Sequence, residues 1–251
     1  MPSTNDVAIE FARTKSLSTP FLVLTEEQTA GRGQHSRKWI ASRGSLTFSL
    51  IVPETFVHSG VQPLLSLAAG LSCAREINGL CSLIRPEGVR VKWPNDLVVI
   101  HEGVWKKLGG ILVESLVAPG AKRHFVIGIG INVANSLEAA PEEVVSSATS
   151  LLHVSTHPPE LQTLLVQLLQ RIETVLSLDP SRLIVQINEL SILTGKSVQL
   201  SLPDGSIVGG ICRGVAADGA ICLESVPGDD VQEFVSGSVA GWDEMSNDLT
   251  E

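Results

Sequence analysis

The sequence predicts an α+β fold, in which a mixed or antiparallel sheet with flanking helices is followed by a small C-terminal β barrel. Three apolar, β-branched runs between residues 89 and 133 are joined by short turns, which favours an antiparallel meander. Apolar residues at helical spacing flank these runs. After Leu193, short alternating strands are separated by PDG, ADG and PGDD, which is typical of a small barrel. These patterns divide the chain into residues 1–190 and 191–251.

The N-terminal third is expected to form a helix, two strands and a second helix. Ser3 or Thr4 is placed to cap the first helix, with Asp6 in its first turn. FLVLTEEQ predicts a strand that runs into a glycine-containing loop, and SLTFSLIVP predicts the strand that leaves it. The second helix is expected from about residue 63 to 77.

The meander and one further helix complete the larger unit. VRVKWPNDLVVI, LGGILVESL and HFVIGIGINV each predict a strand, and HEGVWK and APGAK predict the turns between them. PPELQTLLVQLLQRIETVLSLDP has prolines at both ends and an apolar stripe at helical spacing, so it predicts a helix packed on the core. The stripe consists of Leu161, Leu164, Leu165, Leu168, Ile172 and Val175.

The bulk composition argues against several classes of protein. The 251 residues carry a net charge of -9, whereas binding to nucleic acid or an anionic membrane requires a basic surface. The longest nearly apolar stretch, LLSLAAGLSCA, is too short to span a bilayer, and the N-terminus lacks a signal-peptide layout. The four cysteines form no CxxC pair, so we expect small buried thiols in a cytoplasmic protein.

The segment AGRGQHSRKW combines flexible backbone with positive charge. Gly31 and Gly33 allow the backbone to approach a ligand closely. Arg32, Arg37 and Lys38 are donors of the kind that bind carboxylate or phosphate. A Gly-Arg-Gly turn is also common on solvated surfaces, so the segment alone is weak evidence for a site, and both interpretations stay open at this point.

Two further segments place unusual residues in strands. In VKWPNDLVVI, Pro94 interrupts the ladder, which fits either an edge strand with a bulge or polar groups lining a pocket. GIGIN has two glycines in an apolar run, which is costly unless a ligand or another backbone needs the space. It lacks the third glycine and the following helix of a dinucleotide fingerprint.

Taken in order, these segments resemble the biotin protein ligases (biotin–[carboxyl-carrier] ligases). That family shows a Ser-Thr-Asn segment, a basic GRG loop ending in Trp, a KWPND strand, a Lys before a Gly-rich GIL strand, and a GxGIN strand. The matching segments here are Ser3–Asn5, Gly31–Trp39, Lys92–Leu97, Lys107–Leu112 and Gly128–Asn132. ATSLL, from Ala148, also fits the family.

The resemblance implies a class II synthetase-like catalytic domain over residues 1–190 and an SH3-like β domain over 191–251. It implies the monofunctional type, without an N-terminal DNA-binding domain. The implied activity uses ATP and Mg²⁺ to convert biotin to biotinyl-5′-AMP and then transfers biotin to a lysine of a biotin carboxyl carrier domain. A homodimer is compatible with the resemblance. Lipoate or octanoate transfer is the alternative within the superfamily, and a non-enzymatic biotin-binding module is the alternative outside it.

The resemblance also assigns roles to individual residues. Lys107 and Arg32 are implied as catalytic cations, and no Mg²⁺ ligand is assigned, although Asp96 is near enough in sequence to consider. The implied biotin-binding residues are Ser3, Thr4, Asn5, Gln28, Arg32, Gly33, Gln34, Lys107, Gly109, Gly128 and Gly130. The implied ATP- or adenylate-binding residues are Arg32, Arg37, Trp39, Asn95 and Asn132.

The chain departs from the family pattern in two places. Gln34, His35 and Ser36 stand where the family loop is often more basic and has another glycine, so retention of the intermediate is expected to depend more on Arg32 and Arg37. The C-terminal SGSVAGWDE offers no arginine for a cationic contact with ATP. His153 and His157 have no accompanying carboxylate motif, so we expect no metal site there.

Overall fold

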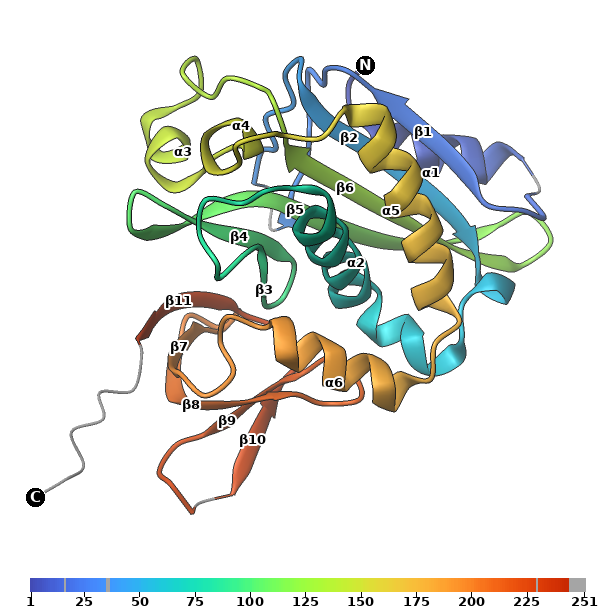
Figure 1. The fold of residues 1–251 in the computed structure, drawn as a ribbon. Helices are drawn as coiled ribbons and strands as arrows, with labels where there is room; N and C mark the ends of the chain where they lie inside the picture. Colours follow the sequence, from blue (N-terminus) through green and yellow to red (C-terminus); the bar gives the residue numbers. More distant parts are fainter. Residues whose placement is uncertain (16, 35–36, 229, 244–251) are drawn as a thin grey trace, which may run out of the picture.

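The computed structural model describes residues 1–15, 17–34, 37–228 and 230–243, and within these it forms two antiparallel sheets with helices packed around them (Figure 1). The six-stranded sheet has the order β1-β2-β6-β5-β4-β3, and its strands are β1 (Phe21–Thr25), β2 (Ser45–Pro53), β3 (Arg90–Lys92), β4 (Asp96–His101), β5 (Val104–Ala118) and β6 (Lys122–Asn132). The five-stranded sheet has the order β10-β9-β8-β7-β11, and its strands are β7 (Ser197–Ser201), β8 (Ile207–Val215), β9 (Ile221–Glu224), β10 (Val231–Phe234) and β11 (Ser238–Asp243). The helices are α1 (Thr4–Thr14), α2 (Leu65–Leu80), α3 (Glu142–Ser147), α4 (Leu151–Val154), α5 (Leu161–Leu176) and α6 (Pro180–Leu190), with 3-10 turns η2 (Glu54–Phe56) and η3 (Ser59–Leu64).

The predicted α+β fold and the antiparallel meander are confirmed. Strands β3 to β6 follow one another in the chain and pair as neighbours. The segment VRVKWPNDLVVI, expected to be one strand, is instead the two antiparallel strands β3 and β4. Pro94 has no N–H to donate to a ladder, and it lies in the turn between them.

Both faces of the six-stranded sheet are covered, by different helices. Alternate residues of β2 point to opposite faces. Phe48 and Leu50 belong to the large apolar core that also contains residues of α2 and α5, whereas Ile51 packs with Ala8 and Ala12 of α1. Every residue of β2 is therefore buried, including the polar Ser45, Thr47 and Ser49 that alternate with its apolar residues.

The start of α1 is held by a distant side chain rather than by a local cap. Ser3 occupies the N-cap position, but its side chain makes no capping hydrogen bond. The N–H of Thr4 donates instead to Oε1 of Gln28 at 2.6 Å. Asp6, expected to stabilise the first turn, is engaged in an ion pair with Arg32 at 2.7 Å. The first turn is thereby tied to the loop that follows β1.

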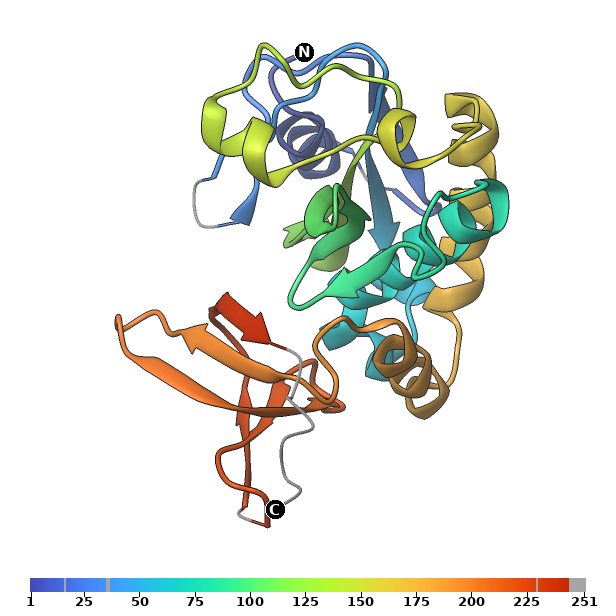
Figure 2. The same cartoon turned by 60° about the vertical axis from the view of Figure 1, so that its left-hand side comes forward.

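The second sheet packs against the edge of the first near β3, with α6 beside it (Figure 2). The indole Nε1–H of Trp93 donates to the carbonyl of Gly219 at 3.0 Å, and the N–H of Ile192 donates to the carbonyl of Val91 at 2.9 Å. These bonds connect the turn between β3 and β4 directly to the C-terminal part. Among the described residues, no helix has the length and apolar character needed to cross a membrane.

A buried thiol makes the free energy of unfolding depend on pH in the alkaline range. Burial raises the pKa of Cys73 to about 12, from an ordinary value of 9.0. Above pH 9 the unfolded chain therefore releases a proton that the folded chain keeps, so the thiol's contribution to stability is complete below pH 9 and is lost as pH rises toward 12. Between these pH values, the free energy of unfolding falls by up to about 1.4 kcal/mol per pH unit because of this thiol.

We expect the free energy of unfolding in urea to fall more steeply with pH in the wild type than in Cys73→Ala, over the range from about pH 9 to pH 11. The comparison cancels the titration of surface lysines, which both proteins share. Parallel pH dependence in the two proteins would show that the Cys73 thiol is not protected by burial.

Candidate functional site

One face of the six-stranded sheet forms a floor of small and polar residues. Antiparallel register aligns Thr47 on β2 with Gly130 on β6, and Gly130 with Gly110 on β5. Gly110 in turn faces Asp96 on β4. The next row contains Ser49, Gly128 and Leu112. Because these positions alternate with core residues along each strand, the floor lies on the face opposite α2 and α5.

A cavity of about 470 Å³ lies over this floor, a size suited to a small-molecule ligand. All the predicted site residues except Gly109 line it. Those that do are Ser3, Thr4, Asn5, Gln28, Arg32, Gly33, Gln34, Arg37, Trp39, Asn95, Lys107, Gly128, Gly130 and Asn132. His35 and Ser36 lie outside the described residues.

Gly109 does not line the cavity, whereas the neighbouring Gly110 does, and the contact of Gly109 with biotin stays a prediction. Gly109 pairs with Ile131, and a Cβ built there would come within 2.6 Å of the carbonyl oxygen of Gly130 and 3.2 Å of Leu97 Cδ1. Its hydrogen-only side chain therefore serves packing between strands. Which of the two adjacent glycines lines the cavity depends on the face of β5 that each one occupies.

A β-bulge directs Lys107 onto the cavity face. Leu97 pairs with Gly109 and Val98 with Lys107, so Leu108 is an extra residue on β5. Such a bulge changes the face to which the preceding side chain points. Lys107 consequently lies over Gly110, where a Cβ would be only 3.4 Å from Lys107 Nζ.

Lys107 and Lys92 share the carboxylate of Asp96. Lys107 Nζ is 2.6 Å from Asp96 Oδ1, and Lys92 Nζ is 3.4 Å from Asp96 Oδ2. The Asp96 side chain is only 14% exposed, which strengthens these contacts relative to a surface ion pair. Two ammonium groups with one carboxylate leave a net positive charge at this end of the cavity.

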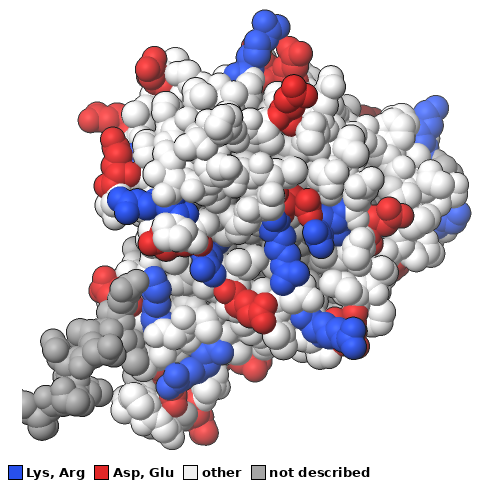
Figure 3. Space-filling view, in the orientation of Figure 1, with Lys and Arg blue, Asp and Glu red and all other residues white. Residues whose placement is uncertain are grey.

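This positive charge is local. On the face seen in Figure 3, Lys and Arg side chains are interspersed with Asp and Glu rather than gathered into one basic surface. The face in view therefore carries mixed charge, as expected for a chain with a net charge of -9.

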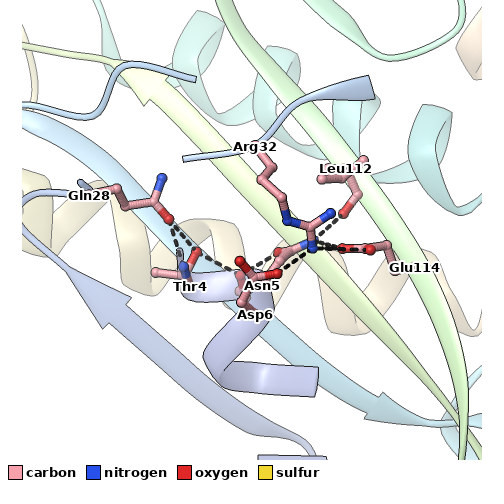
Figure 4. Close-up of polar contacts among 8 residues, drawn as sticks. Thr4, Asn5, Asp6, Gln28, Arg32, Leu112 and Glu114 are labelled. Carbon is pink, nitrogen blue, oxygen red and sulfur yellow. Dashed lines mark hydrogen bonds and ion pairs between the residues drawn. The ribbon is translucent and has the colours of Figure 1, made fainter. Parts of the chain in front are cut away.

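A connected polar network forms the other end of the cavity (Figure 4). Gln28 Oε1 accepts hydrogen bonds from the N–H and hydroxyl of Thr4. The hydroxyl of Ser49 lies 2.8 Å from Thr4 Oγ1 and 2.6 Å from Asn5 Oδ1. Asn5 Nδ2 donates to Glu114 Oε2 at 2.8 Å. Thr4, Asn5 and Ser49 are buried, whereas Gln28 and Glu114 are partly buried, and mutual hydrogen bonding fixes the positions of these groups.

Arg32 joins this network to the basic loop. Its Nη2 is 2.7 Å from Asp6 Oδ1 and 2.8 Å from Glu114 Oε2, as Figure 4 shows. Burial alone would lower the pKa of Arg32, but hydrogen bonds and ion pairing with Glu114 and Asp6 raise it overall. The guanidinium is thus ion-paired with two carboxylates, and these ion pairs anchor the loop to α1 and β5.

The loop itself folds back as a short hairpin. Arg32 and Lys38 form an antiparallel bridge, and the N–H of Trp39 donates to the carbonyl of Gly31 at 3.0 Å. A Cβ at Gly31 would be 2.7 Å from Gln28 Nε2, so this glycine allows the close return of the chain. The hairpin brings Trp39 over the floor.

The floor glycines accommodate side chains of the protein itself. A Cβ at Gly128 would overlap Asn5 Oδ1, and one at Gly130 would overlap the indole of Trp39. Asn5 and Trp39 thus lie directly over these glycines, and the expectation that both glycines also leave room for a bicyclic ligand ring stays a prediction. Within the described residues, they first leave room for Asn5 and Trp39.

Sequence reasoning missed several cavity residues. Thr47 and Trp105 line the cavity, and Ser49 and Glu114 hold the residues that do. The period-two series Ser45, Thr47, Ser49 in an otherwise apolar strand was a usable signal for a polar face. The second sheet contributes Gly237, Ser238, Val239 and Trp242, which no local pattern indicates.

Comparison with known proteins places these features in a family. The sequence profile of the biotin/lipoate A/B protein ligase family matches residues 1–132, which contain α1, the basic loop and all the strands of the floor. The biotin–[acetyl-CoA-carboxylase] ligase of Mycobacterium tuberculosis is 35% identical over 208 residues, covering 81% of this chain and 73% of that protein.

The chain belongs to this family.

Other relatives share the fold over most of the chain. The bifunctional ligase/repressor BirA of Escherichia coli is 30% identical, over 88% of this chain and 66% of BirA. The structure of the Aquifex aeolicus biotin protein ligase in complex with biotin and ATP superposes with a TM-score of 0.75 at 24% identity, covering 97% of this chain and 95% of that one. The Leishmania major enzyme in complex with biotinyl-5-AMP gives 0.61 at 25% identity, covering 92% and 94% of the two chains.

The variant Gly128→Ala tests whether Asn5 packs directly on Gly128. The added Cβ would displace Asn5 and break its hydrogen bonds with Ser49 and Glu114, at a net cost of about 0.5–1.5 kcal/mol for each bond lost. We expect the free energy of unfolding in urea to decrease accordingly. Gly79→Ala on α2, where a Cβ meets open space, is the control and should not destabilise. Equal stability of the two variants would contradict the packing described.

Proposed function

We propose that this protein is an ATP-dependent biotin protein ligase. It would form biotinyl-5′-AMP from biotin and ATP, and then transfer biotin to a lysine of a biotin carboxyl carrier domain. The observation that carries the proposal is the joint presence of a net positive cluster, Lys92, Asp96 and Lys107, and a buried polar network in one cavity of a chain of this family. The relatives are named for the same activity.

The first step joins two anions. A carboxylate oxygen of biotin attacks the α-phosphorus of ATP, the bond to the β-phosphate oxygen breaks, and pyrophosphate leaves. Repulsion between carboxylate and phosphate must be offset by fixed positive charge. Lys107 is the proposed catalytic cation, because the bulge at Leu108 and the bare floor at Gly110 hold its ammonium over the cavity.

In the second step the acceptor amine attacks the acyl carbon of the mixed anhydride, and AMP leaves with the electron pair of the broken bond. Before that, the anhydride must be kept from water. The hairpin loop is proposed to cover it. Arg32, the second predicted catalytic residue, is assigned the task of anchoring that loop through Asp6 and Glu114.

The polar network is proposed to recognise the ureido ring of biotin. Thr4 and Asn5 line the cavity and present a hydroxyl and an amide, which both donate and accept, as a cyclic urea requires. Ser49 holds both side chains in place from below. Ser3, Gln28, Gly33 and Gln34 stay proposed contributors, since they line the same cavity.

The nucleotide is proposed to lie toward Trp39 and the positive cluster. Trp39 Nε1 is buried with no hydrogen-bond partner among the described residues, so it is available to a ligand acceptor. Asn95 donates to the carbonyl of Ile111 at 2.7 Å and Asn132 to that of Thr149 at 3.1 Å. These two amides hold the cavity wall, and their contact with the nucleotide, like that of Arg37, stays a prediction.

Mg²⁺ is proposed to arrive with ATP, where it would neutralise charge on the phosphates. The described residues hold no cluster of three or more His, Cys, Asp or Glu side chains suited to a metal ion. Asp96 is engaged by two lysines. Phosphate oxygens and water are therefore the expected ligands, as is usual for this ion.

The proposal is tested by incubating the protein with MgATP, a biotin carrier domain, and either biotin or lipoate, and by measuring the mass of the carrier. We expect the mass of one biotinyl group to be added with biotin only. Lys107→Met should lower the rate of adenylation about 10²–10³-fold, as for removal of a placed electrostatic group. Modification by lipoate alone would favour the alternative ligase, and biotin binding without adenylate would indicate a binding module.

Arg32→Ala should release biotinyl-5′-AMP, because the loop loses its two ion pairs with α1 and β5. We expect free adenylate in solution and biotinylation of unrelated lysines on a bystander protein, detected by streptavidin blot. Arg43→Ala is a matched control, since Arg43 pairs with Glu26 on the surface and does not line the cavity. Retention of adenylate by Arg32→Ala equal to that of Arg43→Ala would contradict the anchoring role.

A further inference from the structure

The second sheet supplies one wall of the cavity. Gly237, Ser238, Val239 and Trp242 of β11 and the turn before it face the residues of the first sheet. The hydrogen bond from Trp93 Nε1 to the carbonyl of Gly219 holds the second sheet against the turn that carries Lys92 and Asp96. The relative position of these parts is therefore set by a specific contact beside the site.

Trp242 lies against the ammonium group of Lys92. Lys92 Nζ is 5.2 Å from the centroid of the Trp242 ring, within the range of a cation–π interaction. The same ammonium is 3.4 Å from Asp96 Oδ2, and the Lys92 side chain is only 19% exposed. Lys92 is thus held from two sides, by a carboxylate of the first sheet and by an aromatic face of the second.

A register shift in β11 accompanies this placement. Val239 pairs with Leu200 and Gly241 with Gln199, so Ala240 is an extra residue on β11. A bulge of this kind changes the direction of the side chains that follow it. Trp242 then pairs with the buried Val198 of β7 and packs against the core.

An aromatic ring holds a cation without neutralising it. Lys92 and Lys107 carry two positive charges against the single negative charge of Asp96. A second carboxylate at position 242 would cancel the remaining charge. The quadrupole of an indole attracts the ammonium and leaves the net charge available to an anionic ligand.

We propose that Trp242 is a positioning residue that orients Lys92 toward the phosphates of ATP, so that the second sheet completes the nucleotide part of the site. This inference rests on the proposed function. It distinguishes the two ends of the cavity, because the hydrogen bonds of the polar network around Asn5 do not involve Trp242.

The test is a double-mutant cycle on the affinity for MgATP, measured by calorimetry on the full chain. Trp242→Leu should weaken MgATP binding roughly 3- to 30-fold, the range expected from loss of a cation–π contact. Biotin affinity, measured in the same way, should stay unchanged. Trp242→Phe should restore most of the affinity for MgATP. In a Lys92→Met background, Trp242→Leu should add less than about a twofold effect.

Phe234→Leu on β10 is the matched control. It removes a partly buried ring from the same sheet, away from the cavity, and should leave both affinities unchanged. The proposal is overturned if Trp242→Leu binds MgATP as the wild type does, if it weakens biotin and MgATP alike, or if its effect is as large in the Lys92→Met background. A wild type that binds MgATP but forms no biotinyl-5′-AMP would contradict the proposed function instead, and the cycle would still be measurable.

Discussion

The site depends on two ammonium groups held around one carboxylate on the floor of the cavity. Lys107 and Lys92 contact opposite oxygens of Asp96, and the arrangement keeps a net positive charge in a partly buried place. Isolated lysines there would repel each other, and two lysines with two carboxylates would have no charge left for an anion. One shared carboxylate satisfies both requirements. The proposed chemistry, which brings a carboxylate to a phosphate, needs that residual charge.

Side chains along the strands alternate between the core and the cavity, so the fold can be stable while the cavity face carries a net positive charge. On β6, Ile127, Ile129 and Ile131 enter the large core with α2 and α5, while Gly128 and Gly130 face the cavity. The apolar face supplies the driving force for packing, so the opposite face is free to carry glycine and polar residues. Glycines in strands weaken them. Here they allow Asn5 and Trp39 to lie directly on the sheet.

The fold could be predicted from the sequence because apolar alternation is a local signal of each strand. Most of the residues that line the cavity could be named because the short motifs resemble those of the biotin protein ligases, and the roles of these residues stay predictions. What could not be predicted depends on contacts between distant segments. The sequence does not show which of Gly109 and Gly110 lies on the cavity face, because the bulge at Leu108 that decides it has no local sequence pattern. Gln28 replaces Ser3 as the partner of the first turn of α1 across more than twenty residues.

Contacts between distant segments also explain the ion pairs of Arg32 and the placement of Trp242 beside Lys92. Arg32 was predicted to be a catalytic cation facing the ligand, yet Asp6 and Glu114, from two other elements, hold its guanidinium. The sequence around Trp242 contains no motif that predicts a binding site. Only the packing of the second sheet brings Trp242 to Lys92. Charge pairing over long sequence separations is set by tertiary structure, and a single sequence does not reveal it.

The proposed role of Lys107 is that its ammonium group recognises the reacting carboxylate of biotin. The most direct test compares the affinities of biotin and biotinol, its uncharged alcohol analogue, for the wild type and for Lys107→Met by calorimetry. We expect the wild type to prefer biotin, and the variant to lose this preference while still binding biotinol. An undiminished preference for biotin in Lys107→Met would contradict it.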